Sequence, residues 1–300
     1  MRPVRRELRS QGAGAGLQLP GFSEGLFHVQ DISSSLCAKA LDAEKDMRVI
    51  DVCAAPGGKS TQLKMKLGEN GVLVSNEIIS SRCKILTGNI ERLGLRNVIT
   101  TCMDSAKLAK TFPGYFDMIM VDAPCSGEGM FRKDPVAVDE WSLENVDICW
   151  RRQRRILTDI WPSLKPGGLL IYSTCTFNRE EDEDNVAWIA RELGAEILPV
   201  SIDDSWGITG NLVGRDFPVY RFLPHKTKGE GFFLAVLRKH EGECEETPSR
   251  KLKTPSRMDK KKKGKDNKQP LIVPKEVKEW LQASGDYQLT INGTTVQAFP

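Results

Sequence analysis

The chain has 300 residues, of which 40% are hydrophobic and 28% charged, so it is long enough to bury a large core. No apolar run approaches the roughly 20 residues that a membrane-spanning helix needs. The N-terminal arginines are not followed by the apolar stretch of a secretory signal. These features exclude a membrane-embedded or exported protein and predict a cytoplasmic one.

The cysteines, histidines and charges indicate which kinds of binding site the chain can have. None of the eight cysteines forms a Cys-x-x-Cys pair and the three histidines are scattered, so we expect free thiols and no bound metal. The net charge is +3, but residues 249–268 contain ten Lys or Arg against two Asp. The rest of the chain is therefore mildly acidic, and the overall charge says little about the ligand.

In chain order, residues 1–24 come first; they are basic and then rich in Gly and Ala, which predicts little regular structure. From residue 25 to about 240, apolar runs of strand length alternate with stretches of helical periodicity. The strand-like runs are Met47–Val52, Val72–Ser75, Val98–Cys102, Phe116–Val121 and Gly168–Cys175. The helix-like stretches are Lys59–Leu67, Ser80–Leu93, Leu143–Leu164 and Arg179–Leu193.

This alternation predicts an α/β domain over residues 25–240, with a mostly parallel sheet and helices on both faces, because strands buried on both faces are apolar throughout. Two later runs, Val219–Leu223 and Gly231–Arg238, predict an antiparallel hairpin at one edge. Residues 241–270 contain few apolar residues, which predicts a basic, flexible linker. Residues 271–300 have helical spacing and then strand-like residues, but about thirty residues cannot form a core of their own.

Acids and thiols follow each of the five strand-like runs of the predicted parallel sheet. They are Asp51 and Cys53, Glu77, Asp104, Asp122 and Cys125, and Cys175. In open parallel sheets, ligands bind outside the carboxyl ends of the strands. Because a stable core requires none of these side chains, their position indicates a ligand site.

The loop after the first strand has the glycines of a ligand-binding turn: Cys53, Ala54, Ala55, Pro56, Gly57, Gly58 and Lys59. It lacks the spacing of a dinucleotide fingerprint and of a phosphate-binding loop. Glu77 lies about 20 residues further on, where an acid can bind ribose hydroxyls. A nucleoside cofactor without a pyrophosphate grip points to S-adenosylmethionine, with Asp51 at its methionine end and Asp104 near its adenine. The alternative for the loop is a glycine turn that binds no ligand. The alternative for Asp104 is the N-cap of a helix.

Cys125 and Cys175 differ from four other cysteines, which we expect to be small buried hydrophobes: Cys37, Cys83, Cys102 and Cys149. Each follows a strand on the ligand side, among hydroxyl groups and an acid. A thiolate is a natural nucleophile for an electron-poor ring carbon. Methylation of carbon 5 of a pyrimidine requires such an attack at carbon 6, because carbon 5 is otherwise not nucleophilic enough.

In these residues the chain resembles the RNA (cytosine-5)-methyltransferases of the NOL1/NOP2/Sun family, and within it the bacterial small-subunit ribosomal RNA branch called RsmF. The resemblance covers roughly residues 25–240. The matching stretches are Asp51–Ser60, Asp122–Pro135, Tyr172–Phe177 and Pro224–Leu237. Pro-Cys-Ser-Gly together with Ser-Thr-Cys-Thr is specific to this family, whereas the glycine loop is shared with many folds.

The resemblance implies a Rossmann-like, S-adenosylmethionine-dependent methyltransferase fold and a monomer that acts on RNA, above all 16S ribosomal RNA. It implies that Cys175 adds to carbon 6 of cytosine and that Cys125 helps to eliminate Cys175 from the product. Asp122 would contact the flipped base near the methyl donor. The cofactor-binding residues would be Cys53–Lys59, Glu77, Asp104 and Asp122.

The resemblance also implies that residues 271–300 begin a C-terminal RNA-binding module. Arg132 and Lys133 are candidates for RNA contacts because they follow Cys125. Four arginines on one predicted helix are further candidates, with a solvated helix face as the alternative: Arg151, Arg152, Arg154 and Arg155. The competing functions are methylation of a tRNA cytosine, and a catalytically weak RNA-binding or assembly factor on the same fold. Transfer to an exocyclic amine is disfavoured because the expected Asn/Asp-Pro-Pro-aromatic motif is replaced by Asp-Ala-Pro-Cys.

Overall fold

The computed structural model describes residues 20–31, 33–40, 46–241, 288–292 and 295–299. The chain divides into two compact units, Met1–Gly242 and Glu243–Pro300, and each is described by itself. Among the described residues, no helix is long and apolar enough to cross a membrane.

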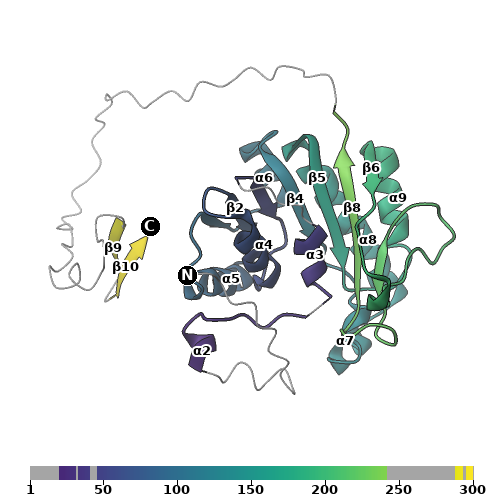
Figure 1. The fold of residues 1–300 in the computed structure, drawn as a ribbon, viewed down its shortest axis with the longest axis horizontal. Coiled ribbons are helices and arrows are strands. Elements are labelled where there is room, and N and C mark those ends of the chain that lie inside the picture. The colour runs from purple at the N-terminus through teal and green to yellow at the C-terminus, as the bar shows by residue number, and fades with distance from the viewer. Residues whose placement is uncertain (1–19, 32, 41–45, 242–287, 293–294, 300) are drawn as a thin grey trace. The chain divides into compact units, whose positions relative to one another are not determined.

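The first unit is built on one sheet of eight strands in the order β3-β2-β1-β4-β5-β8-β6, with β7 paired to β8 (Figure 1). The strands are β1 (Arg48–Asp51), β2 (Val72–Asn76), β3 (Val98–Thr101), β4 (Phe116–Asp122), β5 (Leu164–Thr174), β6 (Ala195–Leu198), β7 (Tyr220–Phe222) and β8 (Phe232–Lys239). The first five strands in this order, β3, β2, β1, β4 and β5, run parallel to one another. β8 runs antiparallel to β5, and its other edge pairs with β6 and β7.

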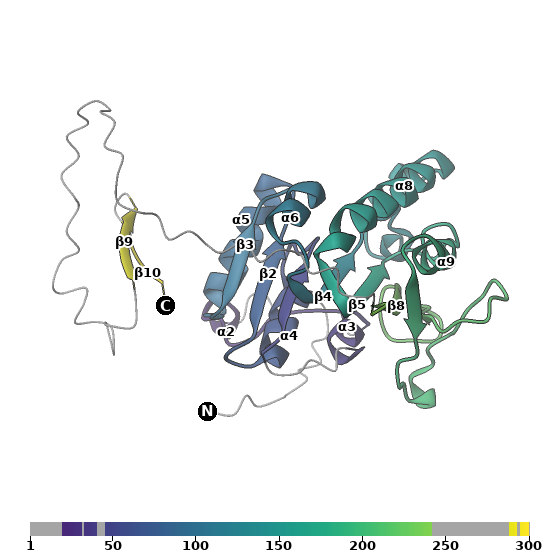
Figure 2. The ribbon, with the colours of Figure 1, turned by 90° about the horizontal axis from the view of Figure 1, so that it is seen from above.

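Helices lie on both sides of this sheet, as Figure 2 shows with the sheet seen from above. They are α2 (Pro20–Ser23), α3 (Ser35–Ala40), α4 (Gly58–Leu67), α5 (Ser80–Arg92), α6 (Ser105–Thr111), α7 (Pro135–Glu140), α8 (Leu143–Ile160) and α9 (Glu183–Glu192). α6, α8 and α9 contribute to the core on one face. α3 and α4 contribute to the core on the other face.

The central strand β4 explains why the apolar runs are continuous. Phe116, Ile119 and Val121 belong to the core under α8, whereas Met118 and Met120 belong to the core under α4. All five side chains are fully buried, because each face of the sheet is covered by helices.

The fold predicted from the sequence is confirmed in class and in most elements. The five parallel strands, the four long helices and the antiparallel pair β7–β8 form where they were expected. The sequence did not predict β6, a four-residue strand that pairs with β8, nor the short helix α7, and it offered α6 only as the alternative interpretation of Asp104. The predicted helix from Arg179 begins only at Glu183, because Asn178 and Glu181 form hydrogen bonds with each other and with Ser126 instead.

Several sequence predictions fall on residues that the structure does not describe. They concern residues 1–19 of the N-terminal segment, residues 242–270 of the linker and the helical spacing in residues 271–287. Within the second unit, β9 (Gln288–Asn292) and β10 (Thr295–Phe299) pair as an antiparallel hairpin, in agreement with the strand-like residues at that end.

Candidate active site

The glycine loop makes a tight turn from β1 into α4. Gly57 has a φ of 112°, a left-handed conformation that favours glycine. A Cβ atom on Gly58 would lie 3.0 Å from Nε2 of His28. The two glycines therefore allow the chain to turn and let the N-terminal segment approach α4 closely.

A cavity of about 200 Å³ opens beside this loop at the carboxyl end of the sheet. Most residues of the predicted cofactor set line it: Asp51, Cys53, Ala54, Ala55, Pro56, Gly58, Lys59 and Asp122. The sequence did not predict the opposite wall, which comes from the N-terminal segment: His28, Val29, Gln30, Asp31 and Ser34. No residue spacing links this segment to the glycine loop, so only the fold could reveal the contact.

Two polar atoms at this cavity are buried without a hydrogen-bond partner: Oδ1 of Asp51 and Nδ1 of His28. Oδ2 of Asp51 accepts a hydrogen bond from Ser60 Oγ at 2.7 Å. Burial raises the pKa of Asp51 to about 7, although the bond from Ser60 opposes this shift. A buried acceptor and a buried ring nitrogen without partners are sites where a polar ligand can bind.

Glu77 and Asp104 follow β2 and β3 but do not line this cavity. Glu77 is buried, accepts a hydrogen bond from the amide of Ile79 at 2.9 Å and lies 3.4 Å from the guanidinium of Arg82. Asp104 is exposed, and its Oδ1 accepts a hydrogen bond from the amide of Lys107 at 2.9 Å. Asp104 is therefore the N-cap of α6, as the alternative interpretation of the sequence had it.

Lys59 and Asp122 connect the cavity to the end of β4, just before the loop that contains Cys125. Lys59 Nζ lies 2.7 Å from Oδ2 of Asp122, whose Oδ1 accepts a hydrogen bond from Ser173 Oγ at 2.8 Å. Burial alone would lower the pKa of Lys59, but Asp122, Cys37 and Asp51 together outweigh it and the pKa is raised. Lys59 is thus a fixed positive charge at the end of β4.

Cys125 and Cys175 meet because they follow neighbouring parallel strands that are paired up to Asp122 and Ser173. Their sulfur atoms are 3.1 Å apart, and the amide of Cys175 donates to Cys125 Sγ at 3.3 Å. Neither cysteine forms a disulfide. The sequence prediction that these two thiols share one site agrees with this geometry.

The hydrogen bond between the thiols gives them opposite acidities. It lowers the pKa of Cys175, and the positive charge of Lys59 acts in the same direction. The same bond raises the pKa of Cys125, and burial adds to the effect. Cys175 is therefore the thiol that ionises first, with Cys125 as the donor to its sulfur.

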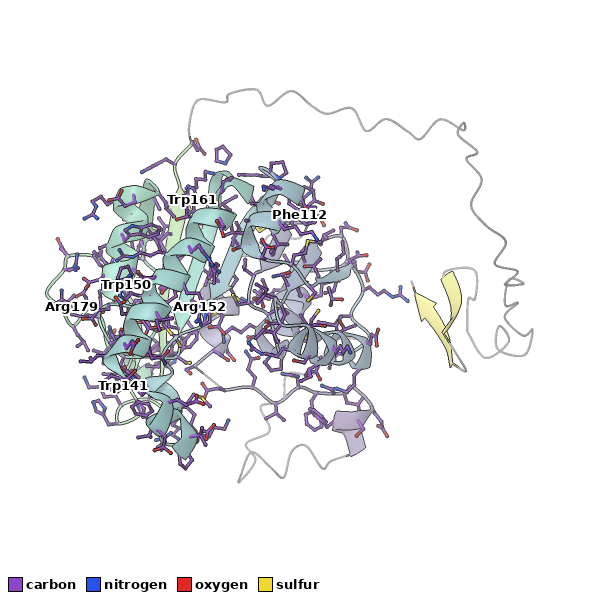
Figure 3. The ribbon with its side chains drawn as sticks, turned by 180° about the vertical axis from the view of Figure 1, so that it is seen from behind. Phe112, Trp141, Trp150, Arg152, Trp161 and Arg179 are labelled. Atoms are coloured by element: carbon purple, nitrogen blue, oxygen red, sulfur yellow. The ribbon has the colours of Figure 1, made fainter. Side chains whose placement is uncertain are left out.

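The basic residues named from the sequence lie in different environments. Arg132 is exposed and bonded to the carbonyl of Gly229 at 2.8 Å, and Lys133 is exposed beside it. On α8, Arg151, Arg152 and Arg155 are exposed. Arg154 packs over the ring of Trp150 and donates to Asn185, so it has a structural role. Figure 3 shows Trp150 and Arg152 along this helix.

The model of the 16S rRNA methyltransferase family RsmB/F matches residues 38–238. The chain belongs to this family. The RsmB/F match covers all the strands of the first unit's sheet except the last residue of β8, and both cysteine loops. The family resemblance expected from the sequence is thereby confirmed.

Relatives and solved structures agree with this assignment. Ribosomal RNA small subunit methyltransferase F of an Enterobacter species is 37% identical over 279 residues, which are 92% of this chain and 57% of that protein. The protein of the same name from Pectobacterium atrosepticum is 40% identical over 217 residues, which are 72% of this chain and 45% of that protein. The crystal structure of NSun6 from Pyrococcus horikoshii with SFG superposes with a TM-score of 0.67 and 34% identity, covering 75% of this chain and 56% of that one.

Two facts follow from these matches. The chain has the Rossmann-like fold of the S-adenosylmethionine-dependent methyltransferases, as predicted. It also spans about half the length of the curated relatives it matches.

Proposed function

We propose that this chain methylates carbon 5 of a cytosine in 16S ribosomal RNA, with S-adenosylmethionine as the methyl donor. The observation that carries the proposal is the meeting of two thiols, 3.1 Å apart, at the ends of neighbouring strands near a cavity lined by the glycine loop. The names of the family and of its relatives support the ribosomal RNA substrate. The two thiols favour methylation of carbon 5 of cytosine, because that reaction requires a nucleophile that adds to carbon 6.

The residues around the cavity fit S-adenosylmethionine. Oδ1 of Asp51 is a buried acceptor without a partner, suited to the protonated amino group at the methionine end. The glycine loop brings backbone groups to the same place, while Glu77 and Asp104 are the candidates for the ribose and adenine. When bound, this cofactor supplies an electrophilic methyl group on a sulfonium.

The two thiols then act in sequence on the flipped base. The thiolate of Cys175 adds to carbon 6 of cytosine, which makes carbon 5 nucleophilic enough to take the methyl group. The proton on carbon 5 then passes to water as the bond between sulfur and carbon 6 breaks, which restores the ring and releases Cys175 as its thiolate. Cys125, whose sulfur lies 3.1 Å from that of Cys175, assists this elimination. Asp122, held by Lys59 and Ser173, contacts the polar edge of the base.

The target base must leave its stack to reach these groups, at a cost of a few kcal/mol. Contacts to the RNA backbone can offset that cost. Arg132 and Lys133 lie in the segment that follows Cys125, on the exposed side of the site, and we assign them to phosphate contacts.

The test is to incubate the protein with S-adenosylmethionine and with 16S rRNA, free or in the small subunit, and to map 5-methylcytosine by bisulfite sequencing. We expect one or a few fully methylated cytosines in 16S rRNA and none in a tRNA control. Binding of both RNAs without any methylation, under conditions where the cofactor binds, would favour the assembly-factor alternative. Methylation of tRNA alone would move the substrate to the other alternative.

A further inference from the structure

Glu181 lies near the end of the loop that contains Cys175 and forms hydrogen bonds with the loop that contains Cys125. One loop follows β4 and contains Cys125, and the other follows β5 and contains Cys175. The side chain of Glu181 is fully buried, and it does not line the cofactor cavity. A buried carboxylate is costly unless it is fully hydrogen-bonded, so its partners show what it does.

Three N–H groups of the described residues donate to this carboxylate. The amide of Ser126 donates to both oxygens, at 3.3 Å and 3.1 Å. Asn178 Nδ2 donates to Oε1 at 2.7 Å, and Gln153 Nε2 donates to Oε2 at 2.6 Å. An uncharged amide in place of the carboxylate would turn an NH₂ group toward one of these donors. The site therefore requires a side chain that only accepts.

These bonds fix the backbone on both sides of Cys125. The carbonyl of Pro124 accepts a hydrogen bond from Gln153 Nε2 at 3.1 Å, and the amide of Ser126 is held by Glu181. Gln153 is itself anchored in the core, because its Oε1 accepts from the hydroxyl of Tyr172 at 3.0 Å. The peptide groups that flank Cys125 are thus tied to α8 and β5.

Glu181 also reaches the loop of Cys175 through Asn178. Asn178 Nδ2 donates to Thr176 Oγ1 at 3.0 Å, and its Oδ1 accepts from the amide of Glu181 at 2.9 Å. The hydroxyl groups of Thr176 and Ser126 are 2.9 Å apart and link the residue after each cysteine. One carboxylate therefore lies at the centre of the bonds that set the position of both loops.

We propose that Glu181 is a positioning residue that holds the sulfur atoms of Cys125 and Cys175 at reacting distance. The proposal rests on the proposed function for its catalytic consequence, but the positioning itself can be measured without RNA or cofactor. In this role Glu181 touches neither the base nor the methyl donor. Its replacement alters the register of the two thiols and leaves the cofactor cavity intact.

The direct test is the ease with which the two thiols form a disulfide with each other. Two thiols and one glutathione disulfide give the protein disulfide and two molecules of reduced glutathione. The equilibrium constant of that exchange is the effective concentration of the thiol pair. It is measured by titrating the protein with glutathione redox buffers and quantifying the 125–175 linkage by peptide mass spectrometry. Glu181→Gln and Glu181→Ala are compared with Glu180→Gln, a change at the adjacent exposed acid.

We expect the effective concentration to fall about tenfold or more in Glu181→Gln and further in Glu181→Ala, because charged hydrogen bonds to buried groups are lost. We expect no change in Glu180→Gln. The affinity for S-adenosylmethionine should stay within about twofold in all three, which also shows that they fold. If Glu181→Ala does not fold, Asn178→Ala replaces it, since it removes the link to Thr176. An unchanged effective concentration in Glu181→Gln overturns the proposal.

A parallel measurement of single-turnover methylation separates the two proposals. A fall in the rate constant at saturating RNA, with KM unchanged, supports the positioning role. If the wild type does not methylate any RNA but Glu181→Gln still lowers the effective concentration, the proposed function fails and the positioning role stands. If methylation proceeds normally in Glu181→Gln, the positioning role fails and the proposed function is unaffected.

Discussion

The hydrogen bond between the two active-site thiols makes two identical side chains chemically different. Cys125 donates to the sulfur of Cys175, and the ammonium group of Lys59 adds a positive charge to the environment of Cys175. The negative charge is therefore stabilised on Cys175 and kept away from Cys125. In the proposed mechanism, Cys175 is therefore the nucleophile and Cys125 the proton donor.

This difference predicts a pH profile. The pKa of Cys175 is lowered, so its thiolate persists to a lower pH than an ordinary thiolate, whose pKa is about 8.5. We expect the alkylation rate of Cys175 by iodoacetamide, followed by peptide mass spectrometry, to rise with pH and to show an inflection that reports this lowered pKa. In Cys125→Ala the hydrogen bond is lost, and the inflection should move to higher pH. An inflection that stays in place in Cys125→Ala would show that the bond does not set the acidity.

The unpartnered oxygen of Asp51 leads to a second prediction. Asp51→Asn keeps the size of the side chain but removes the negative charge at the cavity, so the affinity for S-adenosylmethionine should fall about tenfold, as expected for a lost charged hydrogen bond. Calorimetric titration measures the change. Asp51→Asn with wild-type affinity would mean that the cofactor does not use this oxygen.

Asp104 provides a contrast at the same edge of the sheet. Because its side chain caps α6, Asp104→Ala should lower the free energy of unfolding by about 1 kcal/mol. Urea denaturation measures this loss. A variant as stable as the wild type would show that the cap contributes nothing.

At the scale of elements, the sequence predicted the sheet well because its strands are buried on both sides. An apolar run such as that of β4 has few other structures available to it, and the acids and thiols after the strands then mark the ligand edge. What the sequence could not reveal depends on contacts between distant segments. The wall formed by His28 and Gln30 and the network around Glu181 join segments that no local pattern connects.

The segment between Cys125 and α8 leads to a prediction about RNA. Arg132 and Lys133 are exposed there, and α7 buries no side chain in the core. The double variant Arg132→Ala, Lys133→Ala should weaken binding of 16S rRNA and reduce the slope of log K against log salt by about 1 to 2, since each phosphate contact contributes roughly one. Lys110→Ala, an exposed change in the last turn of α6, is the control and should leave the slope unchanged. If the double variant and the wild type had equal slopes, Arg132 and Lys133 would not belong to the RNA interface.

At the scale of the whole molecule, the fold and the binding of the cofactor belong to the first unit. Its cores consist of residues from Leu36 to Leu237. The ten Lys or Arg of residues 249–268 belong to the second unit and give it positive charge. The two units should therefore contribute separately to catalysis and to RNA affinity.

A chain ending at Gly242 tests this separation. It should fold, bind S-adenosylmethionine as the full chain does, and bind RNA more weakly with a smaller salt dependence. Differential scanning calorimetry and filter binding measure the two properties. A large loss of thermal stability would contradict the separation, and so would RNA binding equal to that of the full chain.

The measurement that bears most directly on the central claim is the identification of the covalent bond between protein and RNA. Cys125→Ala should accumulate an adduct with 16S rRNA in the presence of S-adenosylmethionine, because elimination is slowed while addition continues. Nuclease digestion followed by mass spectrometry should place a methylated cytidine on the peptide that contains Cys175. A Cys125→Ala protein that methylates RNA through no adduct, or an adduct on another residue, would contradict the account.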